Sequence, residues 1–461
     1  MYSITSNHPS VSSKLAEAPQ YTPSFIPLGE NYTYRLLIYS EDFSTLHFDE
    51  QLTPKQKPSI KLVSGKSYKW YCYTMSTTSD LPPLKEGKIQ RNDILGKDLA
   101  VDYGTIYVKP NEINYLDIKF KKVLTRFKIN LNIRGLMGEF SPNTVARISI
   151  GRYYTNPQTM AKEFKEDIVQ MGDFNLISQQ PQFGTLTAQN NYNISLNTEG
   201  DIAGKSSKYT YIYTASFNPI PANQLTLRVK NLVVIHDDNA QERKFTPSST
   251  DEIIIPINNT NSLPLERAIT YNIIARLIES PLVVGQNKWA RTNLIYNNSN
   301  PSNTNKVDRF IFRYDNNYTN PHATEYWEPQ TIDPCSKVYP NGLWRLPTRA
   351  QLQSLINAEG ILRDQQLSLG SNILKFTQYD SPTISHIAYG NSNKLILPYF
   401  GYIDSQNNAT NNLSSNSPEG QYWGYNTSLG YGYINLNPTD ESYVTNFDTN
   451  EKRTIRCVRT Q

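Results

Sequence analysis

The sequence predicts a mainly β protein, with β-sandwiches in the first 280 residues and a different fold after them. Three observations lead to this prediction: apolar residues recur at every second position, turn signals separate these runs, and the composition is rich in tyrosine and poor in charge. The chain has 461 residues, of which 38% are hydrophobic, 19% are charged and 32 are Tyr. This length exceeds one ordinary core and predicts several domains.

The clearest predicted strand covers residues 126–134. Phe127, Ile129, Leu131 and Ile133 alternate there with charged and amide residues, which places one face on a core and the other in water. Further alternating runs lie at 34–39, 116–120, 225–229, 253–257 and 271–277. Turn signals such as Ser-Gly-Lys at 64–66 and Lys-Pro-Asn at 109–111 separate them, as expected for sandwiches.

The sequence changes character near residue 280, where Asn, Ser, Gly and Tyr become dominant. One helix is predicted in this part, with Thr348 as its N-cap and Gly360 beyond its end. Its apolar face would consist of Leu352, Leu355 and Ile356. A single helix among long irregular loops indicates a fold unlike the sandwiches, so we expect a domain boundary at 279–284.

Charge and hydropathy narrow the class of protein. The net charge is +4, from 45 basic and 41 acidic residues without a basic stripe, so we expect no nucleic-acid partner. No apolar run reaches the length of about 20 residues that a membrane helix needs. Residues 1–20 lack a signal-peptide layout. The tyrosine-rich, charge-poor composition indicates an extracellular protein, which must be exported, so we expect a mature form with an added Met1. The alternative is a cytoplasmic protein that begins naturally there. Residues 1–22 are expected to form an extended arm.

The sequence gives no support to catalysis. The five histidines are scattered, and no nucleophile elbow, phosphate loop or dinucleotide fingerprint occurs. We therefore expect no enzyme, no cofactor and no metal. The late acidic residues Asp440, Glu441, Asp448 and Glu451 are interpreted as a solvated loop, since a calcium site needs about six to eight oxygen ligands.

The first 280 residues resemble the fimbrillin (Mfa-like) superfamily of Bacteroidetes fimbriae. The order and spacing of four segments carry the resemblance: YTYRLLIY at 32–39, VSGKSYKWYCY at 63–73, LTRFKI at 124–129 and RAITYNI at 267–273.

The last 180 residues resemble the bacterial FISUMP-type domain, a variant of the C-type lectin-like fold. The matching segments are WARTNL at 289–294, DPC at 333–335, LWRLPTR at 343–349, LPYFGY at 397–402, QYWG at 421–424 and IRCVR at 455–459. The chain departs from that pattern at 340–342, where the family has a tighter spacing between cysteine and tryptophan. We interpret Trp289, Trp344 and Trp423 as core residues. The tripeptide Glu-Pro-Gln at 328–330 is similar to the sugar-selecting motif of animal C-type lectins, but it lies in the wrong part of the domain.

Together the resemblances imply two tandem antiparallel, transthyretin-like β-sandwiches at 23–121 and 122–278, followed by an α+β C-type-lectin-like domain at 284–461. The three cysteines allow one pair with one left over. Because Cys335 and Cys457 lie at the start and the end of the lectin-like region, they are expected to pair and to leave Cys72 reduced.

The resemblances also imply a function: an accessory subunit at the tip of a bacterial surface fimbrium, assembled by donor-strand exchange. Its partners would be other fimbrial subunits and a host or bacterial surface protein or glycan, and only lipidation of a precursor would attach it to the outer membrane. The expected strand-acceptor groove is lined by Leu36, Ile38, Leu116 and Ile118. The expected ligand contacts are Tyr402, Tyr422, Tyr425, Tyr431 and Tyr433. The alternative is a surface lipoprotein that binds glycans without joining a fibre.

Overall fold

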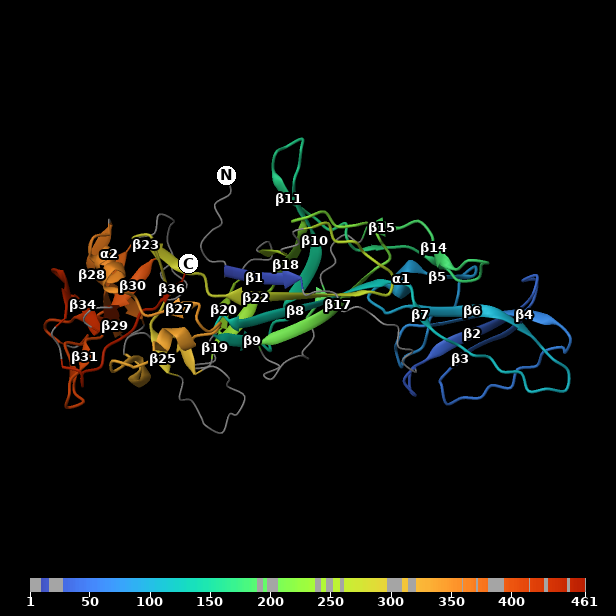
Figure 1. Cartoon of the computed structure of the whole chain (residues 1–461), viewed down its shortest axis with the longest axis horizontal. Helices are drawn as coiled ribbons and strands as arrows, with labels where there is room; N and C mark the ends of the chain where they lie inside the picture. The colour runs from blue at the N-terminus through green and yellow to red at the C-terminus, as the bar shows by residue number, and fades with distance from the viewer. Residues whose placement is uncertain are drawn as a thin grey trace.

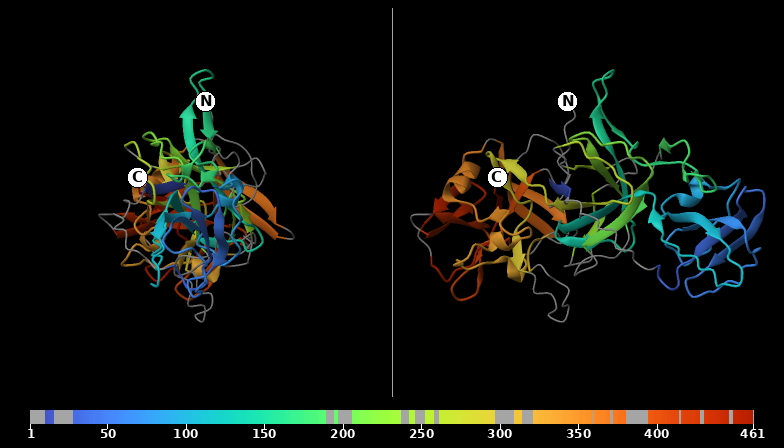
Figure 2. Two further views of the ribbon diagram at one scale, coloured as in Figure 1. Left: turned by 90° about the vertical axis from the view of Figure 1, so that its right-hand side faces the viewer. Right: turned by 45° about the vertical axis from the view of Figure 1, so that its right-hand side comes forward.

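The structure is a computed structural model that describes residues 10–15, 28–188, 194–196, 206–236, 242–245, 252–257, 261–296, 309–313, 321–358, 360–369, 372–379, 394–413, 415–426, 430–445 and 448–460. The protein is mainly β, and its strands form three groups that follow one another along a long axis (Figure 1). A second view shows the same succession (Figure 2). None of the described helices is long and apolar enough to cross a membrane.

The first group is built on one five-stranded sheet. Its order is β3 (Leu46–Leu52), β2 (Tyr34–Ser40), β4 (Ser67–Thr74), β6 (Ala100–Tyr107) and β7 (Lys121–Lys122). Both faces are apolar, because Leu36 and Ile38 belong to one core cluster while Leu37 and Tyr71 belong to another. The cluster on the second face also includes Ile94, from the short helix α1 (Arg91–Ile94).

Strand pairing crosses the boundary expected at 121–122. Strand β5 (Lys88–Ile89) pairs with β13 (Phe174–Asn175), which in turn pairs with β14 (Gln182–Phe183). Phe174 shares a core cluster with Leu37 of the first sheet. The chain therefore returns to the first group after it has entered the second.

The strand predicted at 116–120 is wrong. Residues 113–120 form no strand, although Leu116 and Ile118 pack against the cluster around Leu36. The backbone N–H of Lys119 donates to Oδ2 of Asp102 at 2.6 Å, and the β6–β7 ladder is confined to its first two residue pairs. The alternation at 116–120 therefore correctly indicates that one face of this segment packs on a core, but the segment forms no ladder with the edge of β6.

The middle group contains two main sheets that share one apolar core. One has the order β1 (Ser10–Leu15), β22 (Thr270–Ile278), β8 (Thr125–Gly135) and β17 (Ser207–Thr214). The other has the order β11 (Lys162–Lys165), β10 (Arg147–Thr155), β18 (Leu225–Lys230) and β21 (Ile253–Pro256), with β16 (Ile194–Ser195) beside β10. Smaller pairings join β12 (Gln170–Met171) with β15 (Thr187–Ala188), and β20 (Glu242–Lys244) with β19 (Val233–His236) and β9 (Gly138–Phe140).

The strand predicted at 126–134 is confirmed as part of β8, whose residues alternate between buried and half-buried positions. The ladders between the described strands are antiparallel, as expected, with one exception: β22 pairs with β8 in parallel. Part of the N-terminal arm is a strand, because β1 pairs with the outer edge of β22. The hairpin of β10 and β11 projects away from the body of the middle group (Figures 1 and 2).

The third group consists of short sheets around two apolar clusters. One sheet has the order β23 (Leu282–Val284), β24 (Asn287–Trp289), β36 (Val458–Arg459) and β27 (Trp344–Arg345). The others pair β25 (Leu294–Tyr296) with β26 (Phe310–Phe312), β28 (Ile361–Leu369) with β29 (Asn372–Tyr379) and β30 (Leu395–Pro398), β31 (Tyr402–Ile403) with β32 (Ala409–Thr410), and β33 (Gly420–Asn426) with β34 (Gly430–Leu436) and β35 (Glu441–Val444). Two 3-10 helices, η1 (Ala323–Glu325) and η2 (Pro334–Lys337), lie between β26 and β27.

The predicted helix is present as α2 (Arg349–Ile356), and Thr348 forms a capping box with Gln351. Leu352 and Leu355 are buried in the same cluster as Trp289. Trp344 and Trp423 are also fully buried, so all three of these tryptophans are core residues.

Candidate functional site

The β33–β34 hairpin carries an aromatic face. Tyr425 pairs with Tyr431, and Trp423 pairs with Tyr433, so the four rings lie on one side of the two strands. On the other side Gly424 lies opposite Gly432. A Cβ on Gly424 would come within 2.3 Å of Leu352 of α2, so glycine at this position lets the hairpin pack closely on the helix.

The five tyrosines expected to contact a ligand are not equivalent. Tyr422 is only 1% exposed, and its hydroxyl donates to the carbonyl of Pro398, which corrects its assignment to a contact surface. Tyr433 is 9% exposed and is also buried. Tyr402 and Tyr431 are half-buried, while Tyr425 is 44% exposed. Strand alternation alone does not explain the difference, because Tyr422 packs in one core cluster while Tyr433, on the other face, packs in another.

The buried Arg453 occupies much of the aromatic face. Its guanidinium lies 3.9 Å from the ring centroid of Tyr433, 4.7 Å from that of Trp423 and 5.2 Å from that of Tyr402. Cation–π contacts of this kind stabilise a desolvated arginine. Its charge is also balanced by an ion pair with Glu451. The rings of Tyr402 and Tyr433 therefore contact the buried guanidinium of Arg453 and are not free to contact a ligand with that face.

The remaining rings, Tyr425 and Tyr431, form the candidate contact surface together with Gln330. The two rings meet edge to face, with centroids 6.0 Å apart. The hydroxyl of Tyr431 donates to the carbonyl of Gln330 and accepts from its N–H. Burial raises the pKa of Tyr431, so the hydroxyl stays protonated and can donate. The side chain of Gln330 is exposed beside the rings.

The segment 328–330 therefore lies against the β33–β34 hairpin, which its position in the sequence did not indicate. Glu328 forms an ion pair with Lys452 at 3.3 Å, which connects the segment to the end of the chain. An exposed aromatic plane beside an amide can contact either a sugar or a protein surface. The hydrogen bond to Tyr431 joins positions about a hundred residues apart, so no local signal in the sequence could have found it.

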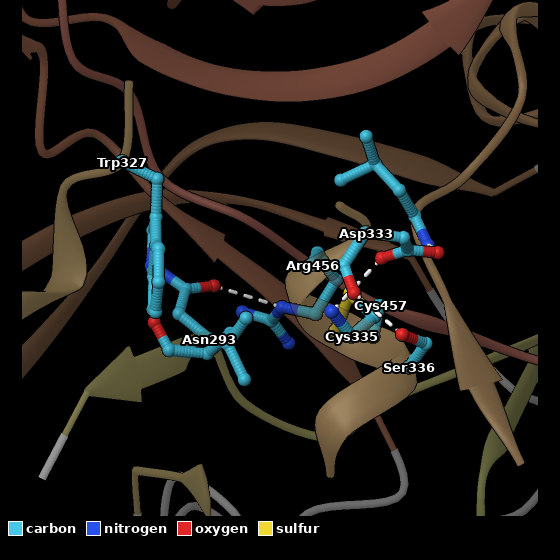
Figure 3. Close-up of a disulfide and its surroundings, with 9 residues drawn as sticks. Asn293, Trp327, Asp333, Cys335, Ser336, Arg456 and Cys457 are labelled. Atoms are coloured by element: carbon cyan, nitrogen blue, oxygen red, sulfur yellow. Dashed lines mark hydrogen bonds between the residues drawn. A yellow bond between two sulfur atoms is a disulfide. The ribbon is translucent and has the colours of Figure 1, made fainter. Parts of the chain in front are cut away.

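A disulfide joins Cys335 and Cys457 (Figure 3), and both cysteines belong to the core cluster against which Tyr431 packs. Cys72 is a free, buried thiol. The carboxylate of Asp333 accepts from the N–H of Cys335 at 2.9 Å and from the N–H of Leu346 at 2.8 Å. Burial raises the pKa of Asp333 in spite of these bonds. The disulfide and Asp333 thus hold the loop before η2 against β27 and β36.

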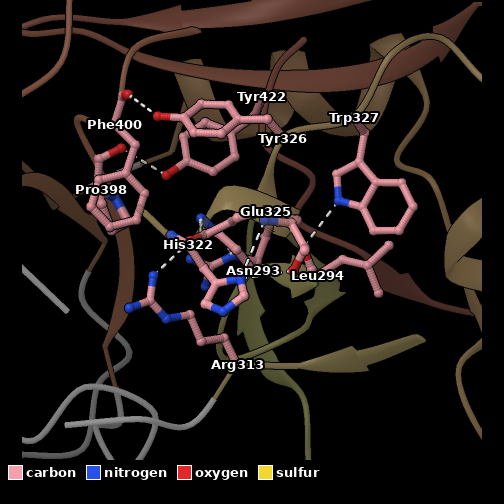
Figure 4. Close-up of polar contacts among 12 residues, drawn as sticks. Asn293, Leu294, Arg313, His322, Glu325, Tyr326, Trp327, Pro398, Phe400 and Tyr422 are labelled. Carbon is pink, nitrogen blue, oxygen red and sulfur yellow. Dashed lines mark hydrogen bonds and ion pairs between the residues drawn. The ribbon is translucent and has the colours of Figure 1, made fainter. Parts of the chain in front are cut away.

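A buried polar network lies next to the disulfide, since Arg456 precedes Cys457 and bonds to Asn293 (Figures 3 and 4). Glu325 is fully buried and accepts from Asn293 at 2.7 Å and from Arg313 at 2.8 Å. Arg456 donates to Asn293 at 2.8 Å and to the carbonyl of Ile396 at 2.7 Å. Since the charges are paired and hydrogen-bonded, this network is suited to holding the fold rather than to proton transfer.

The residues expected to line a strand-acceptor groove lie together in the first group. Leu36 and Ile38 are 3% and 2% exposed, and Leu116 and Ile118 cover them from the segment 113–120. This segment makes no ladder with a neighbouring strand. The four residues therefore form a packed cluster under an extended segment rather than an open groove.

The outer edge of β6 lies beside that segment. Strand β7 pairs with Ala100 and Val101 only, so the part of β6 that follows has a strand on one side, β4, in the described part of the chain. Tyr103 and Tyr107 on this stretch are 45% and 54% exposed. An exposed sheet edge with unpaired backbone groups is a template for an added strand.

Within the described ranges, no group of three or more His, Cys, Asp or Glu side chains is arranged to hold a metal ion. The late acidic residues do not converge there. Glu441 is buried and forms an ion pair with Arg363, and Glu451 pairs with Arg453, so the interpretation of the acidic cluster as a solvated loop is wrong for these two residues.

Comparison with known proteins gives similarity to solved structures alone. No protein-family model and no curated protein matches the chain. A proposed cell adhesion protein of Bacteroides fragilis is 12% identical, with 59% of this chain and 90% of that chain covered and a TM-score of 0.30. A proposed cell adhesion protein of Bacteroides uniformis is 10% identical, with 59% of this chain and 94% of that chain covered and a TM-score of 0.28. The fimbrial anchor protein Mfa2 of Porphyromonas gingivalis is 12% identical, with 48% of this chain and 75% of that chain covered and a TM-score of 0.22. TM-scores this low carry no argument about this chain.

Proposed function

We propose that this protein is a non-enzymatic accessory subunit of a bacterial cell-surface fimbrium, placed at the tip, which accepts a strand from a neighbouring subunit and mediates adhesion through its third group. The observation that carries this proposal is the outer edge of β6, which pairs with no strand of the described residues from Tyr103 to Tyr107 and lies beside the ladder-free segment 113–120. On this edge the N–H of Tyr103 donates to Oδ1 of Asp102. The resemblances of the sequence to fimbrillins and to the lectin-like domain point in the same direction.

Strand acceptance would use the segment 113–120 as a placeholder. Leu116 and Ile118 alternate and pack on the cluster of Leu36 and Ile38, as an added strand would, but they lack ladder hydrogen bonds. A donor strand with the same alternation would fill the apolar positions and also pair with the backbone of β6. It would therefore gain the hydrogen bonds that the placeholder does not make.

The position at the tip is supported by the place of β36. This strand lies between β24 and β27, and Cys457 beside it is joined to Cys335. If β36 were donated to a neighbouring subunit, it would lose its pairing with both β24 and β27. The disulfide would still tie the adjacent Cys457 to Cys335. A subunit that accepts a strand and does not donate β36 would end the growth of a fibre in one direction.

Adhesion is assigned to the surface of Tyr425, Tyr431 and Gln330. The ring of Tyr425 is exposed, and the amide of Gln330 can donate and accept hydrogen bonds. Rigid aromatic area beside an adaptable amide is typical of recognition surfaces.

The test is to mix the full chain with a fimbrial stalk subunit and to follow the formation of a complex that resists SDS. Replacing Leu116 and Ile118 with Ser weakens the placeholder, so exchange should become faster, by about tenfold if the lost packing is about 1.4 kcal/mol. The matched control is Ile113→Ser with Tyr115→Ser, since these side chains are 76% and 82% exposed. A surface lipoprotein outside a fibre would form no such complex in any variant, and that result would overturn the proposal.

A further inference from the structure

The four-stranded sheet of the middle group carries charge of a single sign. All charged residues in β1, β22, β8 and β17 are lysines or arginines. They are Lys14, Arg276, Arg126, Lys128, Arg134 and Lys208. The chain as a whole is nearly balanced, with 45 basic and 41 acidic residues, so this sheet is a local exception.

Four of these cations share the outer face of the sheet, and one of them, Arg134, lies 4.2 Å from the ring centroid of Tyr339 in the third group. Phe127 and Ile129 of β8 point into the core, which places Arg126 and Lys128 on the other side. Asn272 of β22 pairs with Lys128 in register, and Arg276 lies two pairs further along on the same face. Neighbouring positions on one face are about 7 Å apart along a strand and about 5 Å apart between strands. We call Arg126, Lys128 and Arg276 the cationic face.

The cationic face has little counter-charge. Arg126 lies 3.7 Å from Asp98, a carboxylate that also binds Lys122 at 2.6 Å. No carboxylate of the described residues lies within ion-pair distance of Lys128 or Arg276, and both side chains are half-buried rather than enclosed. A cluster of cations without nearby carboxylates attracts anions in the surrounding solution.

The tyrosines of the same face already bind the cations with their ring faces. Lys128 lies 5.0 Å from the ring centroid of Tyr209, and Arg126 lies 4.8 Å from that of Tyr211. Single-stranded nucleic acids are bound by stacking of bases on free aromatic faces, so this arrangement does not suit them. The amide side chains of Asn130 and Asn272 lie between the cations on the same face and can bond to hydroxyl groups.

We propose that the cationic face binds an acidic polysaccharide, whose carboxylate or sulfate groups pair with Lys128 and Arg276 while its hydroxyls bond to the asparagines. A membrane surface fits less well, because Ile274 is the only large apolar residue that β22 presents on this face, and membrane-binding elements bury a broad apolar area. The disulfide of the third group indicates an oxidising compartment, where cell-surface polysaccharides are found. This site is separate from the surface of Tyr425.

The experiment measures binding of the full chain to immobilised heparin and to polygalacturonate over a range of NaCl concentrations. The double variant Lys128→Ser with Arg276→Ser should weaken binding by about tenfold or more, and the slope of log Kd against log salt should become smaller because fewer counterions are released. The matched control is Lys165→Ser on β11, whose side chain is 56% exposed and lies outside the sheet. Circular dichroism checks that the variants are folded.

Three outcomes would overturn the proposal. One is the absence of salt-dependent binding to both polysaccharides. Another is binding that Lys165→Ser weakens as much as the double variant does, which would show a diffuse charge effect. The last is binding to a DNA oligonucleotide or to anionic phospholipid vesicles with the same affinity and the same sensitivity to the double variant, which would assign the face to another class of partner.

Discussion

Glu279 and Arg291 form a buried ion pair across the junction of the middle and third groups, with Oε1 and Nε 3.0 Å apart. The same carboxylate binds Arg243 of β20, at 2.6 Å and 3.1 Å. Glu279 is fully buried, and the two arginines are nearly so. One carboxylate thus forms an ion pair with a cation from each side of the junction.

The junction is apolar as well as ionic. Met137, in the turn between β8 and β9, is 5% exposed and belongs to the same core cluster as Trp344 and Cys457 of the third group. Arg134 beside it lies 4.2 Å from the ring centroid of Tyr339. The two groups therefore share part of a core, and the expected boundary at 279–284 is a packed joint.

The first prediction is that Glu279→Gln destabilises the full chain by about 3–5 kcal/mol, because it leaves two buried arginines without their carboxylate. Urea unfolding gives the free energy. The matched control is Glu30→Gln, since Glu30 is paired with Lys55 on the surface and should contribute less than about 1 kcal/mol. Equal effects of the two substitutions would mean that the joint carries no special stability.

The second prediction concerns a chain that ends after Ser280. It should still exchange strands at β6 and should lose adhesion, but its middle group should be less stable, since Arg291 is removed and Met137 becomes exposed. In the full chain, Met137→Ala should cost about 2–5 kcal/mol, as expected for a core methionine. Urea unfolding of the shortened chain and of the Met137→Ala variant, each compared with the full chain, gives the two free-energy differences. A shortened chain as stable as the full one would contradict the shared core.

The third prediction is that reduction of the disulfide destabilises the third group by about 4–5 kcal/mol, the value that chain entropy gives for a closed loop of this length. The cysteines are separated by 122 residues. Non-reducing peptide mapping should recover Cys335 linked to Cys457, with Cys72 alkylated only after unfolding. Finding all three cysteines alkylated in the unreduced protein would disprove the pairing.

The fourth prediction is a loss of stability in acid that depends on His236. Burial, and next the charge of Arg243, lower the pKa of this histidine from 6.5 to about 3. The unfolded chain takes up a proton below about pH 6.5 while the folded one does not, so stability should fall between about pH 6.5 and 3, by up to about 1.4 kcal/mol per pH unit.

The measurement for His236 is the free energy of unfolding between pH 7 and pH 4, compared with His236→Gln. The variant should lack this component of the slope. His47→Gln is the matched control, because His47 is exposed in the first group and should leave the slope unchanged. If both variants keep the slope of the original protein, His236 does not cause it.

The fifth prediction is that Tyr425→Ala weakens adhesion, by about tenfold if the ring contributes about 1.4 kcal/mol of contact energy. Binding to a glycan array and to whole bacterial cells provides the measurement. Tyr115→Ala is the control, since Tyr115 is 82% exposed but lies in the first group. Unchanged binding after Tyr425→Ala would remove this surface from the proposed function.

Local patterns in the sequence were sufficient for the elements whose partners follow from periodicity and capping. The alternation at 126–134 predicted β8, and Thr348 with its apolar residues predicted α2. Both depend on neighbours within a few positions, where the physical preference of the backbone is expressed directly.

Only the tertiary structure decided which of the alternating segments pair with a neighbouring strand. The alternation at 116–120 is as regular as that of β8, but Asp102 takes the N–H of Lys119, and no ladder forms. Tyr422 and Tyr425 are separated by three residues, but one is in the core and the other on the surface. Trp423, next to Tyr422 and on the other face of β33, is buried as well. Alternation in the sequence thus predicts two faces, and only the packing of distant segments decides which parts of each face are covered.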